Sequence, residues 1–516
     1  MLFFINLSKI IALKTIKWYS YIEKIFLRRD LILAKKSIAK NYLYNLTYQI
    51  LTLILPLITT PYVSRVLGAE GIGIYSYTYS IVSYFILFGG LGIALYGKRE
   101  IAYVQEKKEE RKRIFYELVF FRAITLVIGI AVYCIFFVNS EPYGIYYKIW
   151  LIELIATMFD ISWFFQGLEE FKRTVVRNIM VRLASVTLIF VLVKAPSDLN
   201  KYLMIYAVAD LIGNLSLWLY LPKYFKGIKI KHINIFKHSY AIVMLFIPQI
   251  ASTIYNMLDK TMIGTILVDK TEVGYYEQGQ KVIRILLTIV TSLGIVMIPR
   301  MASTFASGDT KKLNEYMRRS FNFTFFLAFP MIFGLISVAS EFVPIFFGKG
   351  YEKVVILMSV ISPILLLMGT TNVIGTQYLL PTKKQKEYTL SILAGVAVNF
   401  VLNIILIKLW NSIGASIATV ASELVVLIVQ LYMVRNDLNI KDIFKGAKNY
   451  LISSLIMFAV CMLIKHFINV GIISIVVQVA IGGAVYIGML LILKDENVFM
   501  FIDKIKEKIN GILNRN

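Results

Sequence analysis

The sequence predicts an all-α polytopic membrane protein with about fourteen transmembrane helices. Of its 516 residues, 58% are hydrophobic and 17% are charged, whereas a soluble domain carries about 25% charged residues. Apolar stretches recur from residue 41 to residue 493, and each has about the 20 residues that cross ~30 Å of hydrocarbon. We expect no soluble or catalytic domain between them.

The apolar stretches give the order and approximate bounds of the helices. They lie near residues 41–64, 72–97, 115–138, 145–166, 175–194, 202–222, 240–264, 275–298, 321–340, 354–379, 388–407, 412–434, 450–468 and 472–493.

The basic residues alternate between the two sides of these predicted spans. With the N-terminus assigned to the cytoplasm, 42 of the 55 lysines and arginines fall in cytoplasmic segments, nine in outer connections and four within spans. This asymmetry follows the positive-inside rule and predicts that both termini are cytoplasmic. It also accounts for the net charge of +24 without a nucleic-acid partner.

The cysteines and histidines indicate no metal site or disulfide. Cys134 and Cys461 both lie inside apolar spans, and His232, His238 and His466 lie in connections without metal-ligand spacing. We therefore expect no metal and no organic cofactor.

The two ends of the chain lie outside the apolar spans. Residues 1–40 carry nine basic residues among apolar ones, which favours a basic amphipathic helix on the cytoplasmic leaflet. A start-site extension without function is the alternative. Residues 494–516 are expected to form a cytoplasmic tail.

Short motifs recur in the two halves of the chain. Gly73-Ile-Tyr75 recurs as Gly274-Tyr-Tyr276 after about 200 residues, or six helices. An even number of helices gives both copies the same orientation, which predicts a pseudo-two-fold axis along the membrane normal. The expected units are an N-lobe at 41–222, a C-lobe at 238–434 and a further helix pair at 450–493. Two lobes around a cavity suit alternating access.

Several ionisable residues lie within the predicted spans, where an ionised side chain costs at least ~2.5 kcal/mol without a partner or a wet cavity. They are Glu117, Arg122, Glu153, Asp160, Asp210, Asp259, Lys260, Glu277, Lys281, Arg284 and Glu423. Glu153, Asp210 and Glu423 are the deeper carboxylates. Each is either a proton site or a structural partner for Arg122.

The eighth predicted helix carries the most informative charges. Glu277, Lys281 and Arg284 are spaced i, i+4 and i+7, so they share one helical face. That face is expected to line a lumen, where a cationic surface suits a diphosphate group. The alternative is that Glu277 and Lys281 neutralise each other near the outer rim. Asp259 and Lys260 are adjacent, so they need separate partners.

Particular motifs resemble those of a known family. Residues Asn41–Arg65 (NYLYNLTYQILTLILPLITTPYVSR), the following Val66–Gly71 (VLGAEG) and the later Asp160–Gly167 (DISWFFQG) resemble bacterial Wzx-type polysaccharide flippases. These belong to the multidrug/oligosaccharidyl-lipid/polysaccharide exporter superfamily. The resemblance covers about residues 38–495 and is most specific in the first half.

The resemblance implies a function and candidate site residues. Such proteins flip an undecaprenyl-diphosphate-linked oligosaccharide across the bacterial inner membrane by alternating access, for surface polysaccharide biosynthesis, with exchange coupled to H⁺ or Na⁺. A polysaccharide polymerase is a candidate partner. The candidates for diphosphate or glycan contact are Arg65, Arg122, Lys260, Lys281, Arg284 and Arg300. Candidate ion or sugar partners are Asp160, Asp259 and Glu277.

Three other functions fit parts of the pattern. A flippase for the peptidoglycan lipid precursor shares the architecture, although the Trp163–Gly167 motif favours the polysaccharide branch. A multidrug/cation antiporter of the same superfamily needs an acidic or apolar pocket, which Lys281 and Arg284 disfavour. A glycan polymerase or ligase usually needs a sizeable outer loop, and the predicted outer connections are short.

Overall fold

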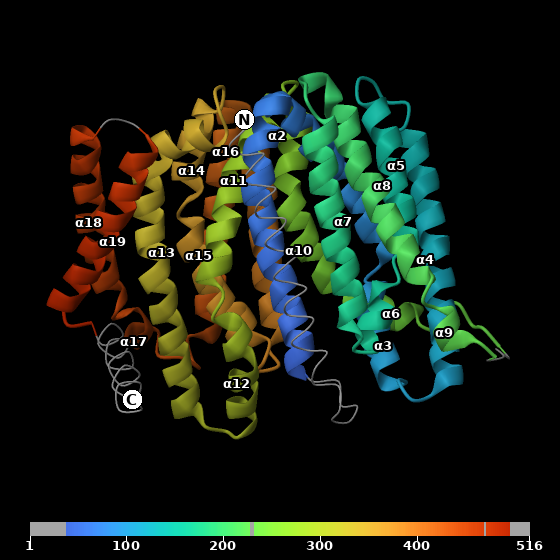
Figure 1. The fold of residues 1–516 in the computed structure, drawn as a ribbon. Coiled ribbons are helices and arrows are strands. Elements are labelled where there is room, and N and C mark those ends of the chain that lie inside the picture. Colours follow the sequence, from blue (N-terminus) through green and yellow to red (C-terminus); the bar gives the residue numbers. More distant parts are fainter. Residues whose placement is uncertain (1–37, 228–231, 469–470, 496–516) are drawn as a thin grey trace, which may run out of the picture.

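The computed structural model describes residues 38–227, 232–468 and 471–495, and every regular element in these ranges is a helix (Figure 1). This confirms the all-α prediction. The predicted interfacial helix at 1–40 and the tail at 494–516 fall almost entirely outside these ranges. The elements are α2 (Ile38–Gly90), α3 (Ile93–Tyr103), α4 (Lys108–Phe136), α5 (Gly144–Met158), α6 (Ser162–Gly167), α7 (Phe171–Leu192), η1 (Pro196–Asp198), α8 (Leu199–Trp218), α9 (Pro222–Phe225), α10 (Ser239–Ile266), α11 (Thr271–Val290), α12 (Gly294–Ala306), α13 (Thr310–Phe346), α14 (Glu352–Ile361), α15 (Ile364–Asn372), η2 (Val373–Leu379), α16 (Gln385–Val434), α17 (Ile440–Phe444), α18 (Ala447–Phe467) and α19 (Ile472–Ile492).

In the described part of the chain, ten helices are long and apolar enough to cross a membrane, or eleven when the bent pair α11–α12 counts as one span. This supports a multi-pass membrane protein. Two of the long helices contain a break. Helix α2 is interrupted at Gly68, where φ is 67°, and α16 is interrupted at Asn411, where φ is 52°. The exact total of fourteen spans stays a prediction.

The break in α2 has a clear physical basis. Its 53 residues would extend about 80 Å at 1.5 Å per residue, far more than the ~30 Å hydrocarbon core. A positive φ is accessible to glycine without steric cost, so Gly68 allows the chain to change direction there. We therefore expect the two halves of α2 to form separate spans.

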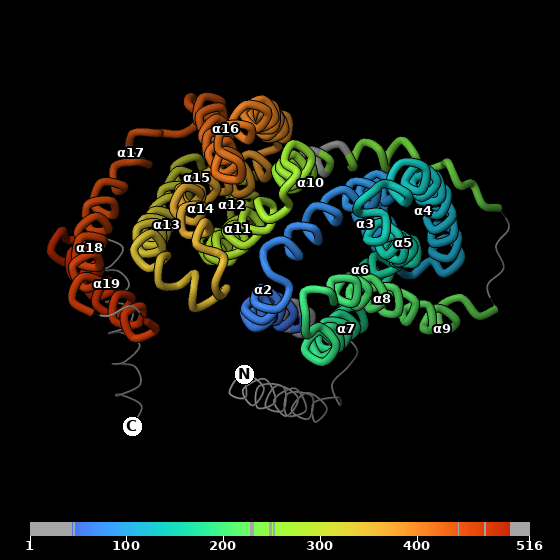
Figure 2. The backbone as a smooth tube through the Cα atoms, turned by 90° about the horizontal axis from the view of Figure 1, so that it is seen from above, coloured from blue at the N-terminus to red at the C-terminus, as the bar shows by residue number. Residues whose placement is uncertain are grey.

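The helices form two groups when viewed from above. Figure 2 shows α3–α9 on one side with part of α2, and α10–α16 on the other, with α18 and α19 beyond α13. Helix α2 packs against both α10 and α11, and α18 and α19 pack on α13. The pseudo-two-fold relation between the groups, and the predicted lobe bounds, stay predictions.

The repeated glycines lie where the two groups touch. A Cβ atom on Gly73 of α2 would lie 1.7 Å from the carbonyl oxygen of Lys270, and one on Gly274 of α11 would lie 1.9 Å from that of Ala69. The two backbones are therefore in direct contact at both positions. The two segments matched as an internal repeat face each other across this contact.

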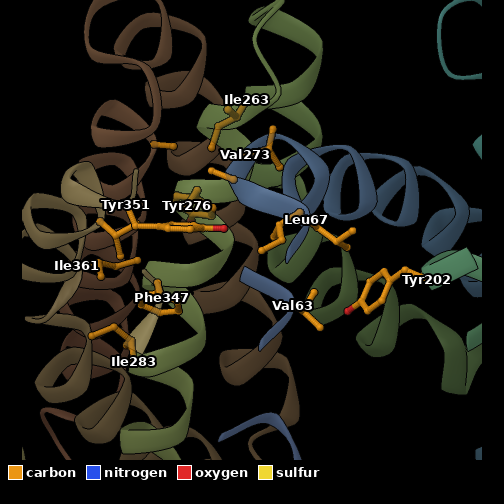
Figure 3. Close-up of a cluster of buried hydrophobic side chains, with 14 of the residues drawn as sticks. Val63, Leu67, Tyr202, Ile263, Val273, Tyr276, Ile283, Phe347, Tyr351 and Ile361 are labelled. Atoms are coloured by element: carbon orange, nitrogen blue, oxygen red, sulfur yellow. The ribbon is translucent and has the colours of Figure 1, made fainter. Parts of the chain in front are cut away.

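Apolar side chains from both groups form a shared cluster beside these glycines. Figure 3 shows Val63 and Leu67 of α2 in the same cluster as Val273 and Tyr276 of α11, together with Tyr351. Polar contacts also join the two helix groups near this part of α2. The Tyr351 hydroxyl donates to the Ser64 carbonyl oxygen at 3.1 Å. These contacts hold the two groups together near the break at Gly68 in α2.

Candidate functional site

Helix α11 carries the predicted charged face. Glu277 forms an ion pair with Lys260 of α10, and the two side chains are 15% and 8% exposed. Glu277 is also the negative charge that acts on Lys281. Among the described residues the direct ion pair of Glu277 is with Lys260, and the alternative in which Glu277 and Lys281 neutralise each other stays a prediction.

Asp259 and Lys260 point to different surroundings, as their adjacency predicts. The Asp259 carboxylate is buried and accepts hydrogen bonds from Asn403 Nδ2 and Thr419 Oγ1, each at 2.7 Å. It also accepts one from the Tyr276 hydroxyl. Asp259 therefore belongs to a polar cluster between α10, α11 and α16, and Lys260 belongs to the charged face.

A chain of hydrogen bonds along α11 connects the charged face to the Asp259 cluster. Arg284, which is exposed, donates from a guanidinium nitrogen to Gln280 Oε1 at 2.9 Å. Gln280 Nε2 in turn donates to the Tyr276 hydroxyl at 2.5 Å, which donates to Asp259. The spacing of four residues places these three side chains in a row on α11.

A cavity of about 250 Å³ lies beside the charged face. Glu277 and Lys281 of α11 line one wall, and α2, α5, α7 and α8 supply the others. The opposite walls present Glu153, Arg182 and Asp210, together with several aromatic rings. A site of this kind can hold an anion against Lys281 and a polar group against the other charges.

Arg182 is a site residue that the sequence analysis missed. It was counted among the basic residues of a cytoplasmic segment, although it falls inside the predicted span 175–194. In the structure it is partly buried on α7 and lines the cavity. The available signal was its position well inside an apolar run, where a cation needs a partner or a wet cavity.

Arg122 and Asp160 lie together, away from α11. An Arg122 guanidinium nitrogen donates to the Asp160 carbonyl oxygen at 2.6 Å and lies 3.9 Å from its carboxylate. Arg177 lies 4.0 Å from the same carboxylate and donates to Asn214 at 3.0 Å. Neither Arg122 nor Asp160 lines the cavity. With Arg177 and Asn214 they form a separate polar network that joins α4, α7 and α8.

Arg65 and Arg300 also lie away from the cavity. Arg65 is exposed and donates to the carbonyl oxygens of Ile345 at 2.5 Å and Pro61 at 3.1 Å. It therefore ties α2 to α13 near the break at Gly68. Arg300 is exposed on α12. Substrate or ion contact by each of the candidate residues, those of the charged face included, stays a prediction.

Comparison with known proteins gives consistent matches. Residues 38–305 match the family described as polysaccharide biosynthesis protein, and residues 245–406 match the MatE family. A putative O-antigen transporter of Escherichia coli (strain K12) is 27% identical over 410 residues, covering 78% of this chain and 98% of that protein. A probable low-salt glycan biosynthesis flippase, Agl15, of Haloferax volcanii is 22% identical over 245 residues, covering 48% of this chain and 50% of that protein.

The fold is similar to that of a solved transporter. The structure described as lipid II flippase MurJ in an inward closed conformation superposes with a TM-score of 0.68 at 18% identity, covering 88% of this chain and 99% of that one. At this identity the similarity shows the fold alone. It is the fold of a membrane transporter.

Proposed function

The chain belongs to the polysaccharide biosynthesis protein family, and we propose that it is a flippase for a lipid-linked oligosaccharide. The cargo is an undecaprenyl-diphosphate-linked repeat unit, which moves from the cytoplasmic to the outer leaflet of the bacterial inner membrane by alternating access. The observation that carries the proposal is Lys281 on the wall of a cavity, next to Arg284 on the same helical face.

The chemistry of this face suits a diphosphate. An ammonium acts as a compact point charge for phosphate oxygens, and a guanidinium offers a planar fork of donors. Attraction between opposite charges strengthens where less water is present, so Lys281, half-buried on the cavity wall, favours an anionic group. The Lys260–Glu277 pair adds little net charge, so Lys281 and Arg284 supply the positive potential.

Ion coupling is the finer part of the proposal, and the Asp259 cluster is the candidate coupling site. Asp259 is surrounded by the oxygens of Tyr276 and Thr419, and Asn403 Oδ1 is buried without a partner. Hard cations prefer oxygen ligands, so this set fits Na⁺, with H⁺ on the carboxylate as the alternative. The hydrogen-bond chain through Gln280 gives a direct physical connection to Arg284.

The alternatives from the same superfamily are weaker. The peptidoglycan lipid precursor also carries a diphosphate, so Lys281 does not exclude it, but the E. coli relative that matches nearly along its whole length is named an O-antigen transporter. An antiporter for cationic drugs is less favoured because the match over residues 38–305 is to the polysaccharide biosynthesis protein family. The orientation with cytoplasmic termini, the inner-membrane location and a polymerase partner complete the proposal.

Gene deletion in the native host tests the proposal. We expect surface glycan to be lost and the lipid-linked unit to accumulate on the cytoplasmic leaflet. A gene encoding Lys281→Ala should fail to restore surface glycan, whereas Lys311→Ala, a matched change at an exposed position of α13, should restore it. Normal surface glycan combined with sensitivity to cationic drugs would show that the assigned cargo is wrong.

A further inference from the structure

The chain passes from the group of α3–α9 to the group of α10–α16 by a connection between α9 and α10. In Figure 2 this connection runs past α4 to the start of α10. Its last residue, His238, is only 6% exposed. His238 Nε2 lies 2.9 Å from Glu117 Oε2 of α4, and Nδ1 lies 2.7 Å from the Tyr96 hydroxyl of α3. The end of the connection is therefore buried between two helices of the α3–α9 group.

The Glu117 carboxylate holds the connection at two points. The side chain is 1% exposed. Its Oε2 binds His238, and its Oε1 accepts a hydrogen bond from the backbone N–H of Asn234 at 2.9 Å. Because both oxygens are used, loss of either contact leaves a buried acceptor without its partner, which is costly. Glu117 therefore favours the state in which the connection is attached to α4.

The two ends of α10 belong to different helix groups. Ile242, in the first turn, is buried in an apolar cluster with residues of α3 and α4. Near the other end, Asp259 accepts hydrogen bonds from Asn403 and Thr419 of α16. Any relative movement of the two groups therefore acts on α10. The strength of the contact at His238 decides whether the start of α10 stays with the α3–α9 group.

The partners of His238 determine how its protons are arranged. An ionised carboxylate only accepts hydrogen bonds, so Nε2 carries a proton and donates to Glu117. In the neutral ring, Nδ1 then accepts from the Tyr96 hydroxyl. When the ring gains a second proton, Nδ1 donates to the Tyr96 oxygen instead, and the contact with Glu117 becomes an ion pair. Hydrogen bonds with charged partners are about twice as strong as neutral ones, so protonation tightens the contact.

The other charges around His238 are paired or exposed. Its ion pair among the described residues is with Glu117. The Arg99 guanidinium of α3 lies 5.2 Å from the centroid of the Tyr96 ring, but it pairs with Glu100 at 3.0 Å. Arg113 of α4 lies 3.9 Å from Glu117 and is 39% exposed, so water screens its charge in part. The remaining titratable side chains of the connection are exposed: His232 and Lys237.

We propose that Glu117, His238 and Tyr96 form a pH-sensitive latch that fixes the start of α10 to the α3–α9 group. The latch is tight while His238 is protonated, and it loosens when the ring loses its second proton. Histidine changes its charge between about pH 5 and 8, so the latch responds within that range. In the orientation proposed above, this end of α10 faces the cytoplasm. The latch lies outside the cavity and does not depend on the cargo.

Hydrogen–deuterium exchange of the purified full-length protein in detergent, without any cargo, tests the latch. The readout is the protection of the backbone amides of residues 234–245 at about pH 5.5 and about pH 8, corrected for the effect of pH on intrinsic exchange. We expect about tenfold greater protection at the lower pH, the difference between a neutral and a charged hydrogen bond.

Three variants separate the charges from the hydroxyl. Glu117→Gln and His238→Gln should each abolish the difference between the two pH values, because each removes one charge of the ion pair. Tyr96→Phe removes a hydrogen bond and neither charge, so it should lower the protection at both pH values and keep the difference. As the mildest change, it tests the latch even where a charge variant does not fold.

Two matched controls change the same residue types elsewhere. His466→Gln alters an exposed histidine of α18, and Glu341→Gln alters a buried carboxylate of α13. Both should keep the tenfold difference, and its loss in either control would refute the latch. Equal protection of the unaltered protein at both pH values would also refute it. So would a difference that survives Glu117→Gln or His238→Gln, or a Tyr96→Phe protein with unchanged protection.

Discussion

The contact between Gly73 and Gly274 allows a direct test of how closely the two helix groups pack. Alanine at position 73 would place a Cβ atom 1.7 Å from a backbone oxygen, whereas an ordinary contact needs at least 3.4 Å. To reach the ordinary distance of 3.4 Å, α2 and α11 must move apart by about 1.7 Å. The neighbouring atoms are backbone, so no side chain can rotate away.

The expected cost follows from two opposing contributions. Alanine gains about 0.5–1 kcal/mol over glycine inside a helix, whereas overpacking a tight contact costs about 1–3 kcal/mol or more. Separation of the helices also opens gaps in the apolar cluster of Val63, Leu67 and Val273. We expect Gly73→Ala and Gly274→Ala each to destabilise the folded protein by about 2 kcal/mol or more.

Thermal unfolding of the purified protein in detergent measures this effect. Gly129→Ala and Gly483→Ala are matched controls, because a Cβ atom at either position meets nothing within 4 Å. The controls should keep or slightly raise the apparent melting temperature, and the two contact variants should lower it by several degrees. Equal melting temperatures for all four variants would refute the direct backbone contact between α2 and α11.

Three further predictions concern the charged face of α11 and the contact between α2 and α13. Glu277→Gln leaves the buried Lys260 without its counter-ion and should lower the free energy of unfolding by about 3–5 kcal/mol. The double variant Lys260→Met/Glu277→Gln should recover most of the lost melting temperature. If it recovers none, the ion pair is not the cause of the loss. Arg65→Ala removes the hydrogen bond to Ile345 and should loosen the contact between α2 and α13, seen as longer distances between spin labels on these two helices. Unchanged distances would contradict this role of Arg65. Gln280→Leu interrupts the chain of hydrogen bonds from Arg284 to Tyr276. We expect the affinity for farnesyl diphosphate to stay the same but no longer to depend on Na⁺ or pH. If the affinity still depends on either, coupling does not run through Gln280.

Some features of the site could be predicted because they follow from spacing along one helix. The i, i+4, i+7 spacing put Glu277, Lys281 and Arg284 on one face of α11, and the adjacency of Asp259 and Lys260 gave them separate surroundings. The repeated glycines were also found from sequence. Each of these depends only on the 3.6-residue period of the helix or on direct comparison of two segments.

Other features depend on how helices pack against each other. Glu277 has two lysines within reach by sequence, and only the placement of α10 against α11 decided that Lys260 is its partner. Arg182 was counted as cytoplasmic because a tally of charges assigns each residue to a side of the membrane and not to a face of a helix. Arg122 has Asp160 as its ion-pair partner, and not one of the deeper carboxylates that the sequence analysis offered, because the packing of α4 decides which carboxylate lies within reach.

The sequence by itself determined that the chain is an all-helical membrane protein, because hydropathy and charge asymmetry reflect the solvent around each segment and need no partner. It also determined which helix carries the charged face, since that follows from local periodicity. Only the tertiary structure decided which charges pair directly and which residues share a cavity. These properties depend on distances between side chains of separate helices, and those distances are set by close packing at contacts such as Gly73 with Gly274.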